Sequence, residues 1–209
     1  GQLWLPIGRP GSVELAPVEF DGTRTGPGVR LPAGFWAHSP DGRGGIVVGG
    51  VGGEYLANRS GVRRISSGSM MAVGPSTFVV QECDESAVCR SVVIDRDSGS
   101  RRVLRTAFER YNAYQSGVIS PDGRTAAITG SGSDASTRLF LLDLTSGKVR
   151  AAPDDVQPTP GEGAPVWSPD GRWLITVSGG DVVVVDPATG RGRSLALGLV
   201  SADAVAVRG

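Results

Sequence analysis

The chain has 209 residues, and its 21 Lys and Arg residues balance its 21 Asp and Glu residues, so the formal net charge is zero. Without an excess of positive charge there is no broad field to attract nucleic acid or an anionic membrane surface, which disfavours nucleic-acid binding. No apolar run approaches the roughly 20 residues that a transmembrane helix needs, so no membrane span is expected. The 32 glycines and 14 prolines, placed between recurring apolar runs, predict a turn-rich globular protein.

The first predicted strands lie at residues 3–5, 13–20 and 29–31, with no strand ahead of them to complete a four-stranded sheet. Asp21 follows the second strand and Thr25-Gly26 precedes the third, which indicates a turn between them. Because the chain begins with Gly1 rather than Met, we expect it to be a mature or excised segment of a longer protein, whose other part could carry an anchor or export signal.

The next predicted unit introduces the phrase Ser-Pro-Asp-Gly-Arg at residues 39–43, and the phrase recurs at 120–124 and 168–172. Each copy stands between two short apolar stretches. Proline presets φ for the first corner, aspartate bonds its own backbone and glycine takes the left-handed conformation. The phrase therefore predicts a tight turn between two strands.

A second phrase places Ser or Thr before Gly, shortly after an Asp or Asn that ends a strand. Its five copies end at Gly26, Gly61, Gly99, Gly147 and Gly190, about 40 residues apart. The two phrases alternate, so each unit has four strands, A to D, with the first phrase between A and B and the second between C and D. A period near 40 residues with four strands per unit is typical of β-propeller blades.

The fold prediction is therefore a single all-β domain, residues 1–209, forming a propeller of five blades with four antiparallel strands each. The predicted blades are 1–33 together with 201–209, 34–68, 69–106, 107–155 and 156–200. A strand at 202–208 would complete the first blade and close the ring, which hides the sheet edges of a linear array. The alternative is a partial propeller that belongs to a larger one.

The turn phrase, together with the strand ending Leu-Leu-Asp-Leu-Thr-Ser-Gly at residues 141–147, resembles the WD40-like (PD40-type) repeats of TolB-type propellers. The resemblance covers most of residues 34–197. It implies an envelope protein that binds other proteins, and related propellers also stand beside peptidase domains, of which this sequence shows nothing. Members of the family usually have six or more blades, so five would be a departure.

Cys83 and Cys89 bracket the predicted tip between strands B and C of the third unit. In a hairpin they could face each other at the separation that a disulfide needs, and two reduced cysteines are the alternative. A disulfide would indicate an oxidising compartment, in agreement with the envelope setting that the resemblance implies. A zinc site is not expected, because the only histidine lies in another unit.

That histidine, His38, stands beside Ser39 and Asp41, which invites comparison with a hydrolase triad. Adjacency in sequence does not make a triad, since the base must reach the nucleophile in space. The Ser and Asp are also explained by turn formation in all three copies of the phrase. We therefore predict no catalytic residue, no metal and no cofactor.

The weak candidates for ligand binding are His38, Trp36 and Trp167. The two tryptophans are expected at equivalent positions near two of the turns, where packing between blades is the competing explanation.

Arginines gather on the predicted D strands, the outermost strands of the blades. They are Arg30, Arg63, Arg64, Arg101, Arg102, Arg105, Arg150, Arg191 and Arg193. Charge on an outer strand protects the sheet from edge-to-edge association, and an anion-binding rim is the functional alternative.

These observations predict a non-catalytic binding module, secreted or in the cell envelope, with a protein or small ligand at one face of the ring. The alternative is a structural or regulatory propeller domain of a larger envelope protein, including a substrate gate for a catalytic domain. A propeller enzyme acting by itself ranks third, because one histidine and no metal-binding set offer little chemistry.

Overall fold

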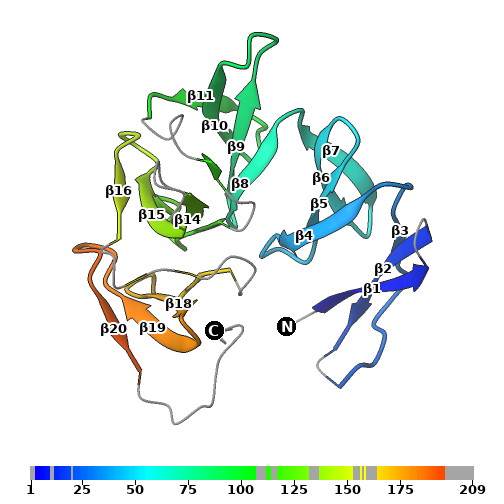
Figure 1. Cartoon of the computed structure of the whole chain (residues 1–209). Helices are drawn as coiled ribbons and strands as arrows, with labels where there is room; N and C mark the ends of the chain where they lie inside the picture. The colour runs from blue at the N-terminus through cyan, green and yellow to red at the C-terminus, as the bar shows by residue number, and fades with distance from the viewer. Residues whose placement is uncertain are drawn as a thin grey trace. The chain divides into compact units, whose positions relative to one another are not determined.

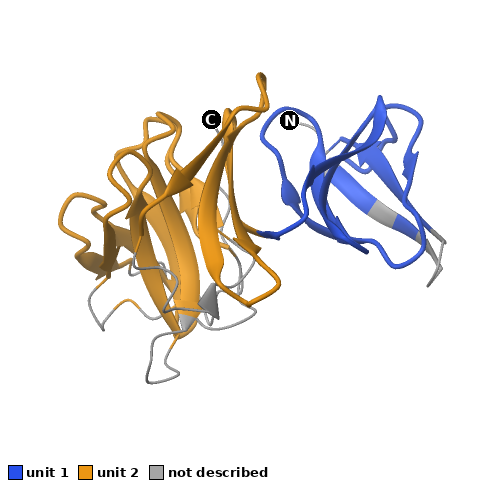
Figure 2. Ribbon diagram, turned by 90° about the horizontal axis from the view of Figure 1, so that it is seen from above, with its two compact units in different colours: residues 1–69 blue, residues 70–209 orange. Residues whose placement is uncertain are grey.

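The computed structural model describes residues 3–9, 12–19, 21–106, 112–113, 117–131, 137–152, 156, 158 and 164–195. Within these ranges every regular element is a β-strand, as the alternating apolar pattern predicts (Figure 1). The chain divides into two compact units, residues 1–69 and 70–209 (Figure 2).

The first unit holds two antiparallel sheets. One has three strands, β1 (Leu3–Arg9), β2 (Ser12–Val18) and β3 (Val29–Arg30). The other has four, β4 (Trp36–Pro40), β5 (Ile46–Gly50), β6 (Gly53–Asn58) and β7 (Gly61–Ser66). A common core joins them, in which Leu15 and Val29 of the first sheet belong to the same buried cluster as Val48 and Ala57 of the second.

The second unit contains a nine-stranded sheet. Its strands are β8 (Ser69–Val73), β9 (Thr77–Cys83), β10 (Cys89–Asp95), β11 (Arg101–Leu104), β12 (Asn112–Ala113), β13 (Gly117–Ile119), β14 (Thr125–Ser131), β15 (Thr137–Asp143) and β16 (Val149–Ala151). The predicted third and fourth blades are its two halves. They join where β8 pairs with β13 in parallel, with Gly117 opposite Ala72.

The repeat pattern does not predict this parallel pairing. It depends on Gly117, because a Cβ atom there would stand 2.3 Å from the carbonyl oxygen of Met71. Glycine is the one residue that allows so close an approach of two backbones.

The last sheet has four antiparallel strands, β17 (Val166–Trp167), β18 (Leu174–Ser178), β19 (Asp181–Val185) and β20 (Gly192–Ser194). Leu174, Val183 and Val185 on one of its faces pack in a buried cluster with Leu139 and Leu141 of β15. Successive sheets of the second unit thus stack face to face through apolar side chains.

Four-stranded arrangements occur where the units 34–68, 69–106 and 156–200 were predicted, and the first sheet has the three strands expected of it. The predicted closing strand at 202–208 lies outside the described residues.

Candidate functional site

The Ser-Pro-Asp-Gly-Arg phrase folds in the same way at residues 120–124 and 168–172. In the second of these, Ser168 Oγ donates to Asp170 Oδ1 at 2.6 Å, and the same carboxylate oxygen accepts from the amide of Arg172 at 3.1 Å. Ser168 Oγ also accepts from the amide of Trp173 at 2.9 Å. Gly171 has a φ of 70°, the left-handed value that this corner requires. The serine and aspartate therefore hold the turn.

The copy at residues 39–43 forms the predicted turn between two strands, with Gly42 at a φ of 73°, but its closure differs from that of the other copies. Strand β4 continues through Pro40, and Asp41 Oδ1 accepts from the amides of Arg43 at 2.8 Å and Gly45 at 2.7 Å. Two glycines follow the phrase here: Gly44 has a φ of 81°, and a Cβ at Gly45 would meet Asp41 Oδ2 at 2.7 Å. This pair of glycines lets the chain fold over the carboxylate, and Asp41 is 2% exposed.

His38 lies at an irregularity of the second sheet. Ala37 pairs with Val48 and Ser39 with Val47, so His38 is the extra residue of a β-bulge on β4. Its Nε2 atom lies 3.2 Å from Oε2 of Glu54 on β6, and both side chains are buried. The imidazole therefore faces a carboxylate that the sequence reading did not single out.

Gly49 makes the His38–Glu54 contact possible. It stands on β5 between the two partners, paired with Trp36 on one side and with Glu54 on the other. A Cβ at position 49 would lie 2.5 Å from His38 Nε2 and 2.6 Å from the indole ring of Trp36. Histidine and glutamate thus meet across a position without a side chain, beside a tryptophan that is 51% exposed.

The two candidate tryptophans do not occupy equivalent positions. Trp167 directly precedes the Ser of its phrase, whereas Trp36 stands three residues before Ser39, so His38 is the counterpart of Trp167. The indole Nε1 of Trp167 donates to the carbonyl oxygen of Val118 on β13 at 3.2 Å, and its ring packs against the cluster between the last two sheets. The structure thus places Trp167 in contact with the preceding sheet, while Trp36 lies beside His38 with their ring centroids 5.8 Å apart.

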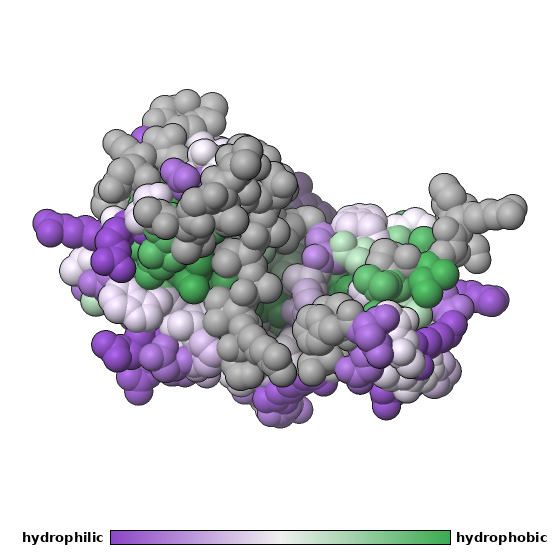
Figure 3. Space-filling view, turned by 90° about the horizontal axis from the view of Figure 1, so that it is seen from below, coloured by the Kyte–Doolittle hydropathy of each residue, from purple (hydrophilic) through white to green (hydrophobic). Residues whose placement is uncertain are grey.

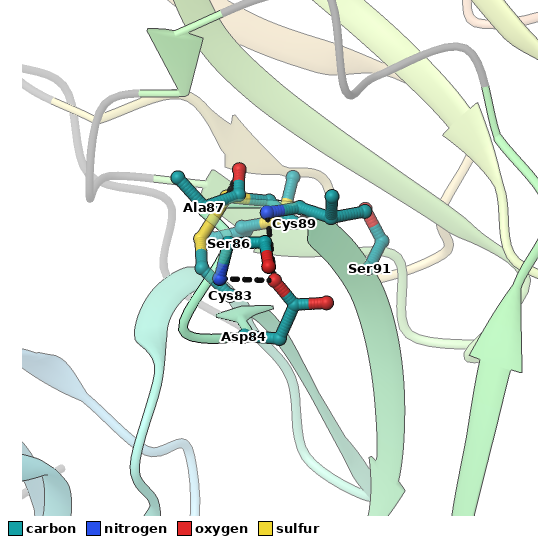
Figure 4. The surroundings of a disulfide bond; sticks show 8 residues. Cys83, Asp84, Ser86, Ala87, Cys89 and Ser91 are labelled. Carbon is teal, nitrogen blue, oxygen red and sulfur yellow. Dashed lines mark hydrogen bonds between the residues drawn. A yellow bond between two sulfur atoms is a disulfide. The ribbon is translucent and has the colours of Figure 1, made fainter.

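Cys83 and Cys89 form the predicted disulfide. They end β9 and begin β10 directly opposite each other, and they enclose a tip whose backbone Asp84 organises (Figure 4). Asp84 Oδ1 accepts from the amides of Ser86 at 2.9 Å and Val88 at 3.0 Å. The tip carries Ala87 with a φ of 59°, the one positive value recorded for a residue other than glycine in the described part of the chain.

The turns between strands C and D follow one pattern in the second unit. Asp143 Oδ1 accepts from the amides of Thr145 at 3.0 Å and Ser146 at 2.6 Å, and Gly147 closes the turn with a φ of 74°. The turn at Asp95 uses the same two contacts, whereas Asp186 accepts from the amide of Ala188 and from the hydroxyl of Thr189. In the first sheet the prediction is wrong in detail. The turn after β2 ends before Thr25-Gly26, because Val18 already pairs with Arg24. The Thr23 amide donates to Asp21 Oδ1, and Gly22 takes the left-handed conformation.

These turn hydrogen bonds stabilise the ionised carboxylates. The pKa of Asp143 falls below 3.8 chiefly because the Ser146 amide donates to the carboxylate. The pKa of Asp122 is lowered chiefly by the Ser120 hydroxyl, that of Asp170 by the Ser168 hydroxyl and that of Asp186 by the Ala188 amide. Since the causes are turn contacts, the lowered pKa values belong to the fold rather than to a catalytic centre.

A hollow lies on the face of the last sheet that points away from β15. Its volume is about 590 Å³, and Trp173, Ile175, Val184, Asp186, Arg191 and Arg193 are among its lining residues. Ile175, Val184 and Arg193 form one row across β18, β19 and β20. Sequence reasoning missed the site, although one signal was present: an arginine follows the turn glycine by three residues in several units.

In the view of Figure 3, hydrophobic residues are uncovered in separate areas, each beside hydrophilic side chains. Among the described residues, no three or more His, Cys, Asp or Glu side chains are grouped so that they could bind a metal ion. The same part of the chain contains no helix long and apolar enough to span a membrane.

No protein-family profile and no curated protein sequence matches the chain. Solved structures do. TolB of Acinetobacter baumannii aligns with 93% of this chain and 56% of its own length, at 15% identity and a TM-score of 0.50. A protein described as a TolB of Agrobacterium tumefaciens aligns with 91% of this chain and 76% of its own length, at 17% identity and a TM-score of 0.59.

A protein described as a dipeptidyl aminopeptidase IV of Bacteroides ovatus is similar over 90% of this chain and 34% of its own length, at 11% identity and a TM-score of 0.51. This chain thus spans little more than half of the Acinetobacter TolB and a third of the peptidase. At such identities the likeness concerns the fold alone. The fold is propeller-like, with the WD40-like architecture of TolB, as the turn phrases predicted.

Proposed function

We propose that this chain, with the propeller-like fold of TolB, is an extracytoplasmic module that binds another protein and catalyses no reaction itself. The hollow on the last sheet carries the proposal. An exposed tryptophan and two arginines surround an apolar floor there, and these residue types dominate the energetics of protein interfaces. Its volume of about 590 Å³ falls in the usual range of ligand sites.

The disulfide supports the extracytoplasmic setting. Cys83 and Cys89 are joined at a solvent-exposed hairpin tip, where a cytosolic thiol pool would have free access to the bond. Such bonds persist in oxidising compartments. The fold shared with TolB is compatible with the same setting.

A ring of five blades, closed by residues 202–208 adding a strand to the first sheet, stays a prediction, and it competes with a partner in the hollow because the first blade would then follow the last one on that side. The three-stranded first sheet supports it, since one further strand would give it the same number as its neighbours in the sequence. Closure would remove the exposed edges that otherwise invite association.

A second candidate is a regulatory propeller domain of a larger protein. The similarity to the Bacteroides peptidase favours it, because this chain corresponds to only 34% of that protein. Under this hypothesis the coding region extends well beyond the present chain and includes a catalytic domain, which inspection of the full gene product would decide.

Photocrosslinking tests the binding function. Benzoylphenylalanine replaces Trp173, Trp36 or, as a control, Val51, which is 80% exposed on the turn between β5 and β6. In the native host we expect position 173 to give one discrete protein adduct and position 51 to give none. Failure of both 173 and 36 to capture a protein would contradict the proposed function, whereas an adduct at 36 alone would move the binding surface to the His38 region.

A further inference from the structure

The disulfide lies at the exposed end of two strands whose pairing does not depend on it. Cys83 and Cys89 form the last pair of the β9–β10 ladder, and residues 83–88 are exposed. Further along the same ladder the side chains are buried, with Phe78 at 1% and Val79 at 0% exposure. Because this apolar part holds the two strands together, breaking the bond leaves the sheet in place.

The loop that the bond closes contains one unfavourable backbone position. The amide of Asp84 donates to the carbonyl oxygen of Val88 at 3.0 Å, and the amide of Ala87 donates to the carbonyl oxygen of Asp84 at 2.9 Å. Residues 85–87 thus form a three-residue hairpin loop, whose last position adopts the left-handed conformation. Glycine favours that conformation, but Ala87 adopts it here with a φ of 59°. The loop is therefore strained at this residue.

Two constraints hold the loop in its conformation. One is the side chain of Asp84, whose Oδ1 atom accepts from the amides of Ser86 and Val88 (Figure 4). The other is the disulfide next to the loop. A strained backbone persists only where its surroundings fix it. Reduction removes one of the two constraints while the strain at Ala87 remains, so it favours release of the loop.

The surroundings of the bond are acidic. Asp84 and Glu85 lie in the loop, and within the described ranges neither carboxylate forms an ion pair. Glu82, by contrast, accepts from Arg101 and stands opposite Arg90 in the ladder. Uncompensated negative charge beside a disulfide slows attack by thiols that carry further negative charge and favours a thiol on a positively charged surface.

We propose that the Cys83–Cys89 bond is a site of reversible thiol–disulfide exchange, reduced by a protein dithiol that presents its cysteines on a positively charged surface. One thiolate of the dithiol displaces a sulfur of this bond and forms a mixed disulfide, which its second thiolate then resolves. Two electrons pass to this chain, the two protons of the dithiol reach the new thiols through water, and the dithiol becomes a disulfide. The reverse exchange re-forms the bond.

Reduction in this proposal releases the loop and leaves β9 and β10 paired. The inference goes beyond the proposed binding function and does not depend on it.

The first test equilibrates the full chain with reduced and oxidised dithiothreitol and counts free thiols by alkylation and mass spectrometry. We expect the bond to open in the folded chain. Ala87→Gly should make it about fivefold harder to reduce, because it relieves the strain of the closed loop only. Ser86→Gly is the matched control, since it loosens the same loop at a residue without a positive φ, and it should not make the bond harder to reduce.

Two results of this test would overturn the inference. A bond that an excess of dithiothreitol leaves closed in the folded chain is not an exchange site. Equal reduction of the Ala87→Gly variant and the parent would mean that the loop keeps its conformation after reduction.

Amide chemical shifts of the reduced chain locate the change. We expect them to move at residues 82–90 and to stay constant for the buried valines of β9 and β10. Loss of the native shifts along both strands would show that the bond holds the sheet, which contradicts the proposal.

The charge of the partner is tested with small thiols. Per thiolate, cysteamine should reduce the bond about threefold faster than mercaptoethanol at low salt, and mercaptopropionate should be slower than both. The spread should shrink at high salt and in Glu85→Gln. Equal rates for the three thiols would overturn the assignment of a positively charged partner.

Discussion

His38 and Glu54 come from different strands of one sheet and meet only because Gly49 stands between them. The sequence singled out His38 as a lone histidine, but it offered no means of finding Glu54. The pairing depends on a β-bulge, which moves His38 out of simple alternation. A sequence shows which residue types are neighbours along the chain, whereas a contact across three strands depends on the register in which those strands pair.

The contacts of the turn aspartates, in contrast, can be predicted from the sequence, because their partners lie two to four residues away along the chain. Asp143 shows this with its contacts to Thr145 and Ser146. Short-range contacts of this kind follow from residue type alone, so the sequence predicted most of these turns correctly. It was wrong in detail at Asp21, where Gly22 closes the turn ahead of Thr25-Gly26.

We expect Asp143 to make stability depend on acid pH. Its pKa in the folded protein lies below the 3.8 of an unperturbed aspartate, chiefly through the Ser146 amide, so its contribution is present above pH 3.8 and is lost as the pH falls through the lowered folded value. Asp143→Asn should reduce the free energy of unfolding at pH 7 by up to about 1 kcal/mol, given the exposure of the site. Urea unfolding at a series of pH values measures this.

Below pH 3.8 the difference between Asp143→Asn and the unsubstituted chain should shrink. Asp181→Asn is the matched control, because among the described residues the Asp181 side chain has no hydrogen bond or ion pair. A constant difference between the Asp143→Asn variant and the parent at all pH values would exclude this linkage.

At the scale of elements, one half of the nine-stranded sheet contacts a turn of the other half. The Arg105 backbone beyond β11 approaches Gly147 so closely that a Cβ at position 147 would lie 2.4 Å from the Arg105 carbonyl oxygen. The sequence explained Gly147 by its left-handed φ alone. The additional contact depends on how the two halves pack together, which no local phrase encodes.

A pair of glycine substitutions separates these two requirements. Gly99 and Gly147 close equivalent turns with φ values of 69° and 74°, but nothing lies within 4 Å of a Cβ at Gly99. Both Gly→Ala changes strain the backbone by about 1–2 kcal/mol. Gly147→Ala should cost at least about 1 kcal/mol more, because it also forces two backbones apart.

Denaturant unfolding of the two alanine variants gives this difference directly. Equal losses of unfolding free energy would show that the Arg105–Gly147 approach contributes nothing to stability.

For the whole molecule, the repeat period predicted the class of fold, and the turn phrases located most of the sheets. The sequence assigned the arginines of the predicted D strands to edge protection, yet Arg102 and Arg150 donate to carbonyl oxygens of the following turns. Only the packing of successive groups of strands brings together residues that are about 40 positions apart in the sequence, such as Arg102 and Leu144.

Ring closure by residues 202–208 can be tested by a substitution within that segment. Ala204→Pro removes a backbone donor from the proposed strand and should lower the melting temperature by several degrees, whereas Ala204→Ser keeps the donor and should not. Thermal unfolding followed by circular dichroism compares the two. A chain that lacks residues 201–209 and melts as the complete chain does would rule the closure out.

The parallel pairing of β8 with β13 has a consequence for how the second unit responds to damage. Backbone hydrogen bonds cross from one half of the nine-stranded sheet to the other at Ala72–Gly117 and Val73–Val118. A protease that cuts between Arg105 and Asn112 would therefore sever the covalent link without separating the halves. The two fragments would stay associated and migrate as one particle until a denaturant opened the sheet.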